Sequence, residues 1–498
     1  MLLINPFIRL HNFTEHPFTK VAAEKEELLE LYFVYPRYFS EALGDARHPK
    51  TYVVFGPRGG GKSAIRAMIA VYASSKQHLD EAGGRVLSIT YDDFTSFSLG
   101  QLNTISLTDH VNEILKRAVV KLTVSLVDQG IIGDNLPSES RGLLRWFIDE
   151  YMTDLSRLEL DNILRALESK SEKVKSLITN AIELYNTVIS ALNLEQIRPT
   201  EAVSEPKNTR DAISSVHVME VFTRLVCGLG FDAFYVLVDK IDETEYTSGD
   251  SSKAAQLVRP ILTNIKLLEI DQLAFKFFLW DNIRSYFGEE LRDDRITMKP
   301  TEWSNEELEQ MLRRRINTYS QNRTQLEDIF SDDLLPKVAN ILVSMAYRSP
   351  RDLNRLMESI FAEAALAATT TNYRIDWSSV NVGLEKFSVV RSNKLYTEDI
   401  VNRVLRIKKP VFTVSDVAAT YKITSGQDEE ESPDQIPNQA ARNSARKIVD
   451  KWVKSGIIKQ IEPLTQVVVT RRREVNQYQI VDPRVLFLLL GEGYLKSL

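Results

Sequence analysis

The stretch that decides the fold is TYVVFGPRGGGKSAIRAMIAVYAS, residues 51–74. Thr51–Phe55 is a short β-branched and aromatic run, which predicts a buried strand. The run opens directly into a glycine-rich loop. Ser63–Ser74 then places Ile65, Met68, Ile69 and Tyr72 at helical spacing. Strand, loop and helix in this order predict the first unit of an α/β fold with a parallel sheet.

The loop matches the pattern GxxxxGK[ST]. Its glycines let successive backbone N–H groups turn inward around phosphate oxygens, Lys62 neutralises charge there, and the Ser63 hydroxyl can ligate Mg²⁺. The flanking strand and helix argue against a glycine turn with no ligand. We therefore expect a P-loop NTPase whose nucleotide-binding residues are Gly56, Pro57, Arg58, Gly59, Gly60, Gly61, Lys62, Ser63 and Ala64.

A magnesium carboxylate is expected at the end of a neighbouring strand, where it faces the γ-phosphate. The run YVLVD supplies Asp239, so Ser63 and Asp239 are the predicted magnesium ligands. Asp242 and Glu243 follow within four residues. One of them is predicted to orient or deprotonate the attacking water, and Glu243 is favoured. An acidic helix N-terminus is the alternative interpretation of this pair.

The rest of the chain suggests several domains. Further strands are expected at Arg85–Thr90, Phe234–Val238 and Phe275–Trp280, separated by helical patterns as in a parallel sheet. The expected order is an N-terminal segment with the first part of the ATPase core (1–101), a helical insertion (102–228), the second part of the core (229–303), a helical lid (304–390) and a C-terminal module (391–498).

Composition excludes other classes of protein. The formal net charge of the 498 residues is −6, so a nucleic-acid surface must be local. A single cysteine, Cys227, excludes an internal disulfide framework. No apolar run reaches the roughly 18–20 residues of a membrane helix, and Met1–Leu10 lacks the charged start and long apolar stretch that are typical of a signal peptide. We expect a cytoplasmic protein without a membrane partner.

The phosphate loop, the strand ending in Asp239, and the spacing Asp239-x-x-Asp242-Glu243 resemble the AAA+ and STAND ATPases, particularly their origin-recognition-like and KAP-like branches. The resemblance implies ATP rather than GTP. AAA+ proteins usually carry Asp-Glu directly after this strand, whereas Lys240 follows Asp239 here. The DxxDE form is nearer to the STAND pattern.

The resemblance also implies roles for polar residues outside the loop. Asn282 or Asp281, after the fourth strand, would sense the γ-phosphate, and a polar strand cap is the alternative. Arg351, in RSPRDL (348–353), would reach the nucleotide from the lid. With Glu243, Asp242 and Lys62, the predicted catalytic set therefore includes Asn282 and Arg351.

Two weaker candidates follow from the same resemblance. Arg292 and Arg295 lie where such proteins carry an arginine finger that acts on a neighbouring subunit, and exposed surface arginines are the alternative. Asn5-Pro6-Phe7 lies where they pack the adenine base, and an ordinary turn is the alternative.

The C-terminal module resembles a winged helix. Helical patterns at Glu398–Ile407, Val414–Tyr421 and Asn438–Ser455 precede strand-like runs at Thr465–Arg471 and Asn476–Val481. Between Ile436 and Arg473, nine Lys and Arg residues oppose two acids. The predicted contacts to double-stranded DNA are Arg442, Asn443, Arg446, Lys447, Lys451, Arg471, Arg472 and Arg473. A protein-contact module is the alternative.

These features predict an ATP-hydrolysing switch that couples its nucleotide state to DNA or a partner protein. The STAND and KAP-like resemblance implies a role in prokaryotic defence against phage or plasmids, with any effector on a separate chain. The alternatives are a nucleotide-gated scaffold with slow turnover and an origin-recognition-like DNA-binding initiator or loader. Homo-oligomerisation would accompany any arginine finger.

Overall fold

The computed structural model describes residues 4–20, 22–74, 78, 80–97, 104–129, 136, 138–153, 155–156, 159–160, 163, 181–198, 214–369, 373–424, 439–468 and 471–498. The chain divides into two units. The sheet unit comprises Ala22–Glu24 and Tyr35–Glu302. The helical unit comprises Met1–Val21, Lys25–Val34 and Trp303–Leu498.

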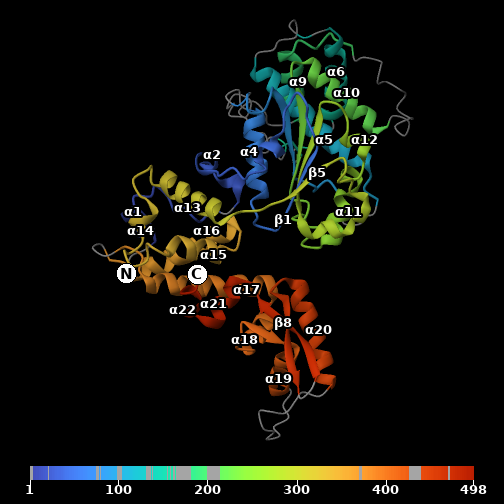
Figure 1. Cartoon of the computed structure of the whole chain (residues 1–498). Helices are drawn as coiled ribbons and strands as arrows, with labels where there is room; N and C mark the ends of the chain where they lie inside the picture. Colours follow the sequence, from blue (N-terminus) through green and yellow to red (C-terminus); the bar gives the residue numbers. More distant parts are fainter. Residues whose placement is uncertain are drawn as a thin grey trace. The chain divides into compact units, whose positions relative to one another are not determined.

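A five-stranded sheet in the order β2-β3-β4-β1-β5 forms the centre of the sheet unit, and its pairings are all parallel (Figure 1). Its strands are β1 (Tyr52–Gly56), β2 (Val86–Tyr91), β3 (Ala233–Val238), β4 (Leu273–Trp280) and β5 (Thr297–Pro300). Strands β1, β3 and β4 are buried almost throughout. Burial on both faces explains why they read as nearly continuous apolar runs, interrupted in β4 by Lys276, rather than as alternating ones.

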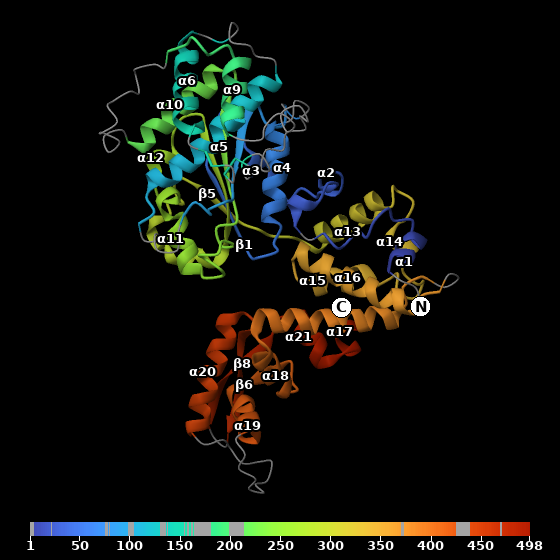
Figure 2. The same ribbon diagram turned by 180° about the vertical axis from the view of Figure 1, so that it is seen from behind.

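Helices cover both faces of the sheet, as Figures 1 and 2 show from opposite sides. On one face, Val53, Phe275 and Val236 pack in a single core with side chains of the long helix α5. On the other face lies α4, which follows the phosphate loop and contacts β2 and β4. The helices of this unit are α3 (Phe39–Leu43), α4 (Lys62–Ser74), α5 (Leu107–Asp128), α6 (Ser138–Met152), α9 (Ala181–Ala191), α10 (Ser215–Gly228), α11 (Ser251–Leu262) and α12 (Ile265–Leu268). This is the predicted P-loop NTPase arrangement.

The edge strand β5 was not expected from the sequence. It has four residues, it ends in Pro300, and its side chains are partly or fully exposed. A short, exposed strand at the edge of a sheet lacks the apolar run that marks the central strands.

The helical insertion between β2 and β3 contains α5, α6, α9 and α10. Helix α5 begins at a capping box, in which Ser106 and Asp109 each satisfy the other's backbone N–H. Its buried side chains join the core on the α5 face of the sheet. The insertion is therefore part of the sheet unit's core in the residues that the structure describes.

The helical unit gathers the N-terminal segment and the lid. Its first helices are α1 (Ile4–Leu10), α2 (Leu29–Tyr32), α13 (Asn305–Tyr319), α14 (Leu326–Ile329), α15 (Val338–Ala346) and α16 (Pro350–Ala367). The break between α15 and α16 falls at Tyr347 and Arg348, whose φ angles are +48° and +60°. Ser349 then caps α16 and Pro350 starts it, which is a favourable helix beginning.

The winged helix follows in the same unit. It consists of α18 (Glu398–Arg406), β6 (Val411–Thr413), α19 (Val414–Thr424), α20 (Gln439–Ser455), β7 (Ile458–Val468) and β8 (Arg471–Ile480). The strands form an antiparallel sheet in the order β6-β8-β7. Trp452 of α20 and Phe412 of β6 lie in its separate core. The short strand β6 was not expected.

Helix α17 (Trp377–Tyr396) runs unbroken across residue 390, the expected end of the lid. A buried network ties it to α16 and α21 (Pro483–Leu490), which α22 (Glu492–Leu495) follows. Asp352 accepts hydrogen bonds from Arg391 and Arg484, each at 2.8 Å. Lid and winged helix therefore share buried ion pairs.

Candidate nucleotide-binding site

The phosphate loop lies between β1 and α4, at the carboxyl end of the sheet. Gly59 and Gly61 have φ angles of +89° and +84°, which favour glycine. The buried Lys62 ammonium donates to the carbonyl oxygens of Gly56 at 2.8 Å and Pro57 at 2.9 Å. The lysine therefore lies back across its own loop, where a phosphate oxygen could replace these carbonyls as its partner.

Thr301, just after β5, lies against the inner side of the loop. A Cβ added at Gly56 would come within 1.9 Å of the Thr301 hydroxyl oxygen, and one at Gly60 within 3.0 Å. The Thr301 backbone N–H donates to the carbonyl of Phe55 at 2.6 Å. The first glycine of the loop, Gly56, is thus required by packing, whereas Gly59 and Gly61 are favoured by their backbone conformation. No sequence signal pointed to Thr301, because nothing marked β5.

Asp239 directly follows β3 as a buried carboxylate beside the loop. Its Oδ1 accepts the backbone N–H of Lys240 at 2.9 Å, and its Oδ2 accepts Arg66 Nε at 3.1 Å. Burial raises the pKa of Asp239, whereas Arg66, the Ser63 hydroxyl and Lys62 oppose that rise. The two predicted magnesium ligands, Ser63 and Asp239, therefore lie close to each other.

The strand that carries Asp239 is not the immediate neighbour of the loop strand. The order β3-β4-β1 places β4 between them, so the prediction of a neighbouring strand was wrong. Periodicity identifies strands but not their order, and a crossover can skip a position. Gly56 pairs with Trp280, so Asp281 and Asn282 begin directly beside the phosphate loop, and both are exposed.

Arg66, on the first turns of α4, was not singled out from the sequence. Its side chain is buried and donates to Asp239, to Thr90 at 3.0 Å and to Glu24 at 3.2 Å. Burial opposes the charged form of Glu24, but the cations around it lower its pKa overall. An arginine on an apolar helix face is the signal that could have marked this position.

Lys240, which breaks the usual Asp-Glu pair, forms ion pairs with Glu24 at 3.0 Å and Asp92 at 3.1 Å. Its φ angle is +60°, in the left-handed region. Burial lowers its pKa, but the two carboxylates outweigh that effect and raise it. Its ammonium therefore belongs to an ion-pair cluster with Glu24 and Asp92.

The acidic turn, defined here as Lys240–Gly249, contains the two candidate bases. Asp242 is buried, and its Oδ2 accepts Arg58 Nε at 2.6 Å. Glu243 is exposed, and its backbone N–H donates to the Lys240 carbonyl at 3.0 Å. The two acids therefore differ in chemistry, since the Asp242 carboxylate is neutralised by an arginine of the phosphate loop.

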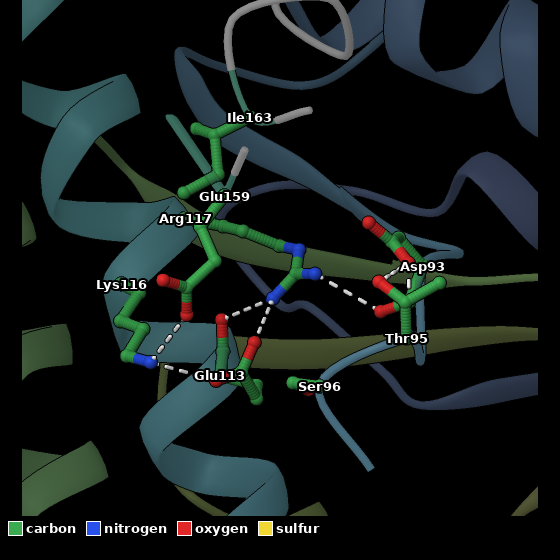
Figure 3. Close-up of a pocket in the computed structure, with 8 residues that line it drawn as sticks. All are labelled: Asp93, Thr95, Ser96, Glu113, Lys116, Arg117, Glu159 and Ile163. Carbon is green, nitrogen blue, oxygen red and sulfur yellow. Dashed lines mark hydrogen bonds and ion pairs between the residues drawn. The ribbon is translucent and has the colours of Figure 1, made fainter. Parts of the chain in front are cut away.

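A small cavity lies between α5 and the segment that follows β2 (Figure 3). Its lining is Asp93, Thr95, Ser96, Glu113, Lys116, Arg117, Glu159 and Ile163. Arg117 donates to the Asp93 carbonyl and to Glu113, each at 2.9 Å, and Lys116 pairs with Glu113 and Glu159, each at 2.9 Å. Opposite charges satisfy one another here, so the cluster anchors α5 to the sheet.

The same segment reaches the acidic turn. The Tyr246 hydroxyl donates to the carbonyl of Thr95 at 3.4 Å. Through Thr95 and the Arg117 contact to Asp93, α5 is connected to the turn that carries Glu243. The helical insertion is thus joined to the candidate site within the sheet unit.

The lid arginine Arg351 lies in the first turn of α16 and is half-buried. Among the described residues it forms no ion pair, unlike its neighbour Asp352. The two finger candidates are exposed and paired within the sheet unit, Arg292 with Asp294 and Arg295 with Glu269.

Phe7, the aromatic residue of the proposed adenine segment, is fully buried in the helical unit. Its ring packs edge-on against Phe361 at 5.7 Å and His11 at 4.8 Å. A ring enclosed by these neighbours serves the core of that unit, and Asn5-Pro6-Phe7 lies in helix α1 rather than in the turn given as the alternative.

The polar face of α20 is exposed at Asn443, Arg446, Lys447 and Lys451, while Ala445, Val449 and Trp452 face the core. Arg442 is half-buried. Arg471, Arg472 and Arg473 begin β8 and pair with Val468, Val467 and Gln466, but their side chains lie outside the described part. Of the basic side chains predicted on this helix, Arg446, Lys447 and Lys451 face solvent.

In comparisons with known proteins, no protein-family model and no curated protein matches the chain. Among solved structures, it is similar to the Aeropyrum pernix ORC2 protein in its ADPNP-ADP complexes, with 9% sequence identity over 98% of each chain and a TM-score of 0.39. None of the described helices is both long and apolar enough to cross a membrane.

Proposed function

We propose that this chain is a magnesium-dependent ATPase of the AAA+/STAND type, in which ATP binding and hydrolysis switch its interaction with DNA or a partner protein. One observation carries the proposal. The phosphate-loop Ser63 hydroxyl and the Lys62 ammonium lie close enough to the buried carboxylate of Asp239 to oppose the rise that burial causes in its pKa. A hydroxyl and a buried carboxylate next to a phosphate cradle are the oxygen donors that Mg²⁺ takes with a nucleotide.

The residues at this edge of the sheet have separate roles in phosphate binding, metal binding and proton transfer. Residues 56–64 bind the phosphates, with Lys62 exchanging its loop carbonyls for phosphate oxygens. Ser63 and Asp239 would hold Mg²⁺, which neutralises charge on the phosphates when it is bound. Glu243 accepts a proton from the attacking water, because Asp242 is already paired with Arg58. Asn282 and the lid residue Arg351 are the candidates for contacts that depend on the γ-phosphate.

Turnover tests the proposal directly. ATP hydrolysis by the purified protein is measured with and without duplex DNA, beside Lys62→Ala and Glu243→Gln. We expect wild-type turnover, loss of nucleotide binding in Lys62→Ala, and nucleotide binding without turnover in Glu243→Gln. A wild-type protein that binds no ATP contradicts the proposal.

A nucleotide-gated scaffold with slow turnover is the second candidate, and Arg66 favours it. The Arg66 guanidinium occupies one oxygen of Asp239, so a metal ion must compete with it. Tight ATP binding with slow, DNA-independent hydrolysis would select this candidate. Turnover stimulated by DNA would instead support a DNA-coupled switch or an origin-recognition-like loader.

The basic face of α20 supports a DNA partner. Support for a defence role against phage or plasmids comes from the STAND and KAP-like sequence resemblance alone. A separate effector chain and homo-oligomerisation are proposals of the same kind. Chromatography with and without ATP would detect a nucleotide-dependent oligomer.

A further inference from the structure

Arg58 stands inside the phosphate loop but makes its side-chain contacts outside it. Its Nε donates to Asp242 Oδ2 at 2.6 Å, and its Nη2 donates to the Asp242 backbone carbonyl at 2.7 Å. The guanidinium also stacks over the Trp280 ring, 4.7 Å from its centroid. One side chain thus joins the ends of β1, β3 and β4.

This contact differs from an ordinary surface ion pair. The Asp242 side chain is 8% exposed, whereas that of Arg58 is 41% exposed. A buried carboxylate that loses its arginine is left as an uncompensated charge, which is strongly unfavourable. The paired bonds and the stacked ring also fix the orientation of the guanidinium, which a single charge contact would not do.

The acidic turn that Arg58 holds is internally tied. The Asp242 carbonyl also accepts the Gly249 N–H at 3.4 Å, and the buried Thr247 hydroxyl donates to the Ile241 carbonyl at 2.8 Å. Gly249 has a φ angle of +83°, and a Cβ there would lie 3.5 Å from Arg58 Nη1. The turn can therefore move as one piece, and Glu243 is the residue next to the clamped Asp242.

We infer that Arg58 is a positioning residue that acts through Asp242 to fix Glu243 relative to the phosphate loop. The inference rests on the proposed ATPase function and adds a role for the arginine at the third position of the loop. Because the Arg58 side chain donates its hydrogen bonds to the acidic turn, removing that side chain should lower the rate of hydrolysis more than the affinity for nucleotide. Asp242 is then the anchor of Arg58 and not the catalytic base.

The experiment compares Arg58→Ala, Arg58→Lys, Asp242→Asn and the double variant Arg58→Ala/Asp242→Asn in the full chain, with the exposed Arg37→Ala as the charge-matched control. Three quantities are measured: kcat for ATP, ATP affinity in a non-hydrolysing Glu243→Gln background, and hydrogen exchange of residues 240–250. Hydrogen exchange reports on the turn independently of turnover.

We expect Arg58→Ala and Asp242→Asn each to lower kcat about 100-fold, the scale of a small misplacement of a catalytic group. ATP affinity should change less than about threefold, and residues 240–250 should exchange faster in both variants. The kcat of the double variant should be no lower than that of the less active single variant, because the two residues act as a unit. Arg58→Lys should retain part of kcat, since it restores charge but not the paired bonds.

Two results would overturn the positioning role while leaving the ATPase proposal intact. One is unchanged exchange of residues 240–250 in Arg58→Ala. The other is a large loss of ATP affinity in Arg58→Ala that Asp242→Asn does not share, which would assign Arg58 to the phosphates themselves. A wild-type protein that neither binds nor hydrolyses ATP removes the proposed function and the positioning role together.

Discussion

At the scale of single residues, the phosphate loop needs a glycine at its first position, because there is no room there for a Cβ atom. The Thr301 side chain fills the space beside Gly56 so closely that a Cβ would come within 1.9 Å of its hydroxyl oxygen and 2.8 Å of its methyl carbon. The loop therefore has no freedom to accept a larger residue at its first position. Its shape at this position is set by Thr301, which lies 245 residues further along the chain than Gly56, roughly half the chain length away.

Gly56→Ala tests this packing. We expect it to cost about 1–3 kcal/mol of stability, the usual cost of overpacking, and to weaken ATP binding. Thr301→Ala in the same chain removes the two closest contacts and should restore part of both losses. Thermal unfolding and ATP titration measure the two effects. Equal stability of Gly56→Ala and wild type would contradict the role given to Thr301.

Lys276 is a second residue whose environment decides its chemistry. It lies in the middle of β4, 1% exposed, and donates to the Lys50 carbonyl at 2.8 Å. Burial lowers the pKa of Lys276 from 10.5 to about 7. The folded chain therefore binds this proton less tightly than the unfolded chain does.

The sign of the pH dependence follows. Between about pH 7 and 10.5 the Lys276 amine is more often protonated in the unfolded chain than in the folded one. The free energy of unfolding therefore rises with pH over this interval, and the contribution of Lys276 is lost as the pH falls through about 7. We expect a gain of roughly 2 kcal/mol between pH 7 and pH 9 from this group. Lys276→Met should flatten the rise in unfolding temperature over that interval. An identical rise in both proteins would show that Lys276 does not cause it.

At the scale of elements, the N-terminal segment is held to α13 by one buried arginine. Arg315 is 1% exposed and pairs with Glu26, and it donates to Tyr32 Oη at 2.6 Å. Tyr319 of the same helix donates to Glu26 at 2.6 Å. The helical unit thus depends on charged groups from two distant parts of the sequence.

Arg315→Met should therefore destabilise the helical unit by roughly 3–5 kcal/mol, because it leaves Glu26 charged and buried. Adding Glu26→Gln should recover part of the loss, since the neutral amide still accepts from Tyr319. Arg313→Ala is the matched control, because Arg313 pairs with Glu309 and Glu327 at the surface and should cost below about 1 kcal/mol. The free energies of unfolding are measured by denaturant titration. Equal losses of stability in Arg315→Met and Arg313→Ala would rule out the buried ion pair as the cause.

At the scale of the whole molecule, charge is distributed unevenly. The chain carries a formal net charge of −6, yet α20 exposes Arg446, Lys447 and Lys451 on one face. Such a face can bind nucleic acid while the rest of the surface repels it. Contacts to phosphates release counterions, so their number appears in the salt dependence of binding.

Replacing Arg446, Lys447 and Lys451 with alanine should weaken duplex DNA binding and reduce the slope of log affinity against log salt by about 3, one unit for each lost phosphate contact. The charge-matched control replaces Arg37, Lys253 and Lys266, which are exposed in the sheet unit. The control should leave the slope unchanged. Equal effects of the two triple variants would mean that net charge, and not the face of α20, governs binding.

The sequence by itself determined the elements whose signal is local. The run into Gly56–Ser63 predicted β1, the loop and α4, and apolar runs predicted β2, β3 and β4 to within a few residues. The three helices of the winged helix followed from helical periodicity. The short strands β5 and β6 were missed because half-exposed runs of three or four residues carry no such pattern.

Only the tertiary structure decided which of these elements meet. It placed β4 between β1 and β3, packed Thr301 under the loop, and joined Arg66 to Asp239 and Arg58 to Asp242. Adjacent acids such as Asp242 and Glu243 are equivalent in a sequence pattern. They separate only in three dimensions, because Asp242 is buried and paired with an arginine from another strand end, whereas Glu243 is exposed.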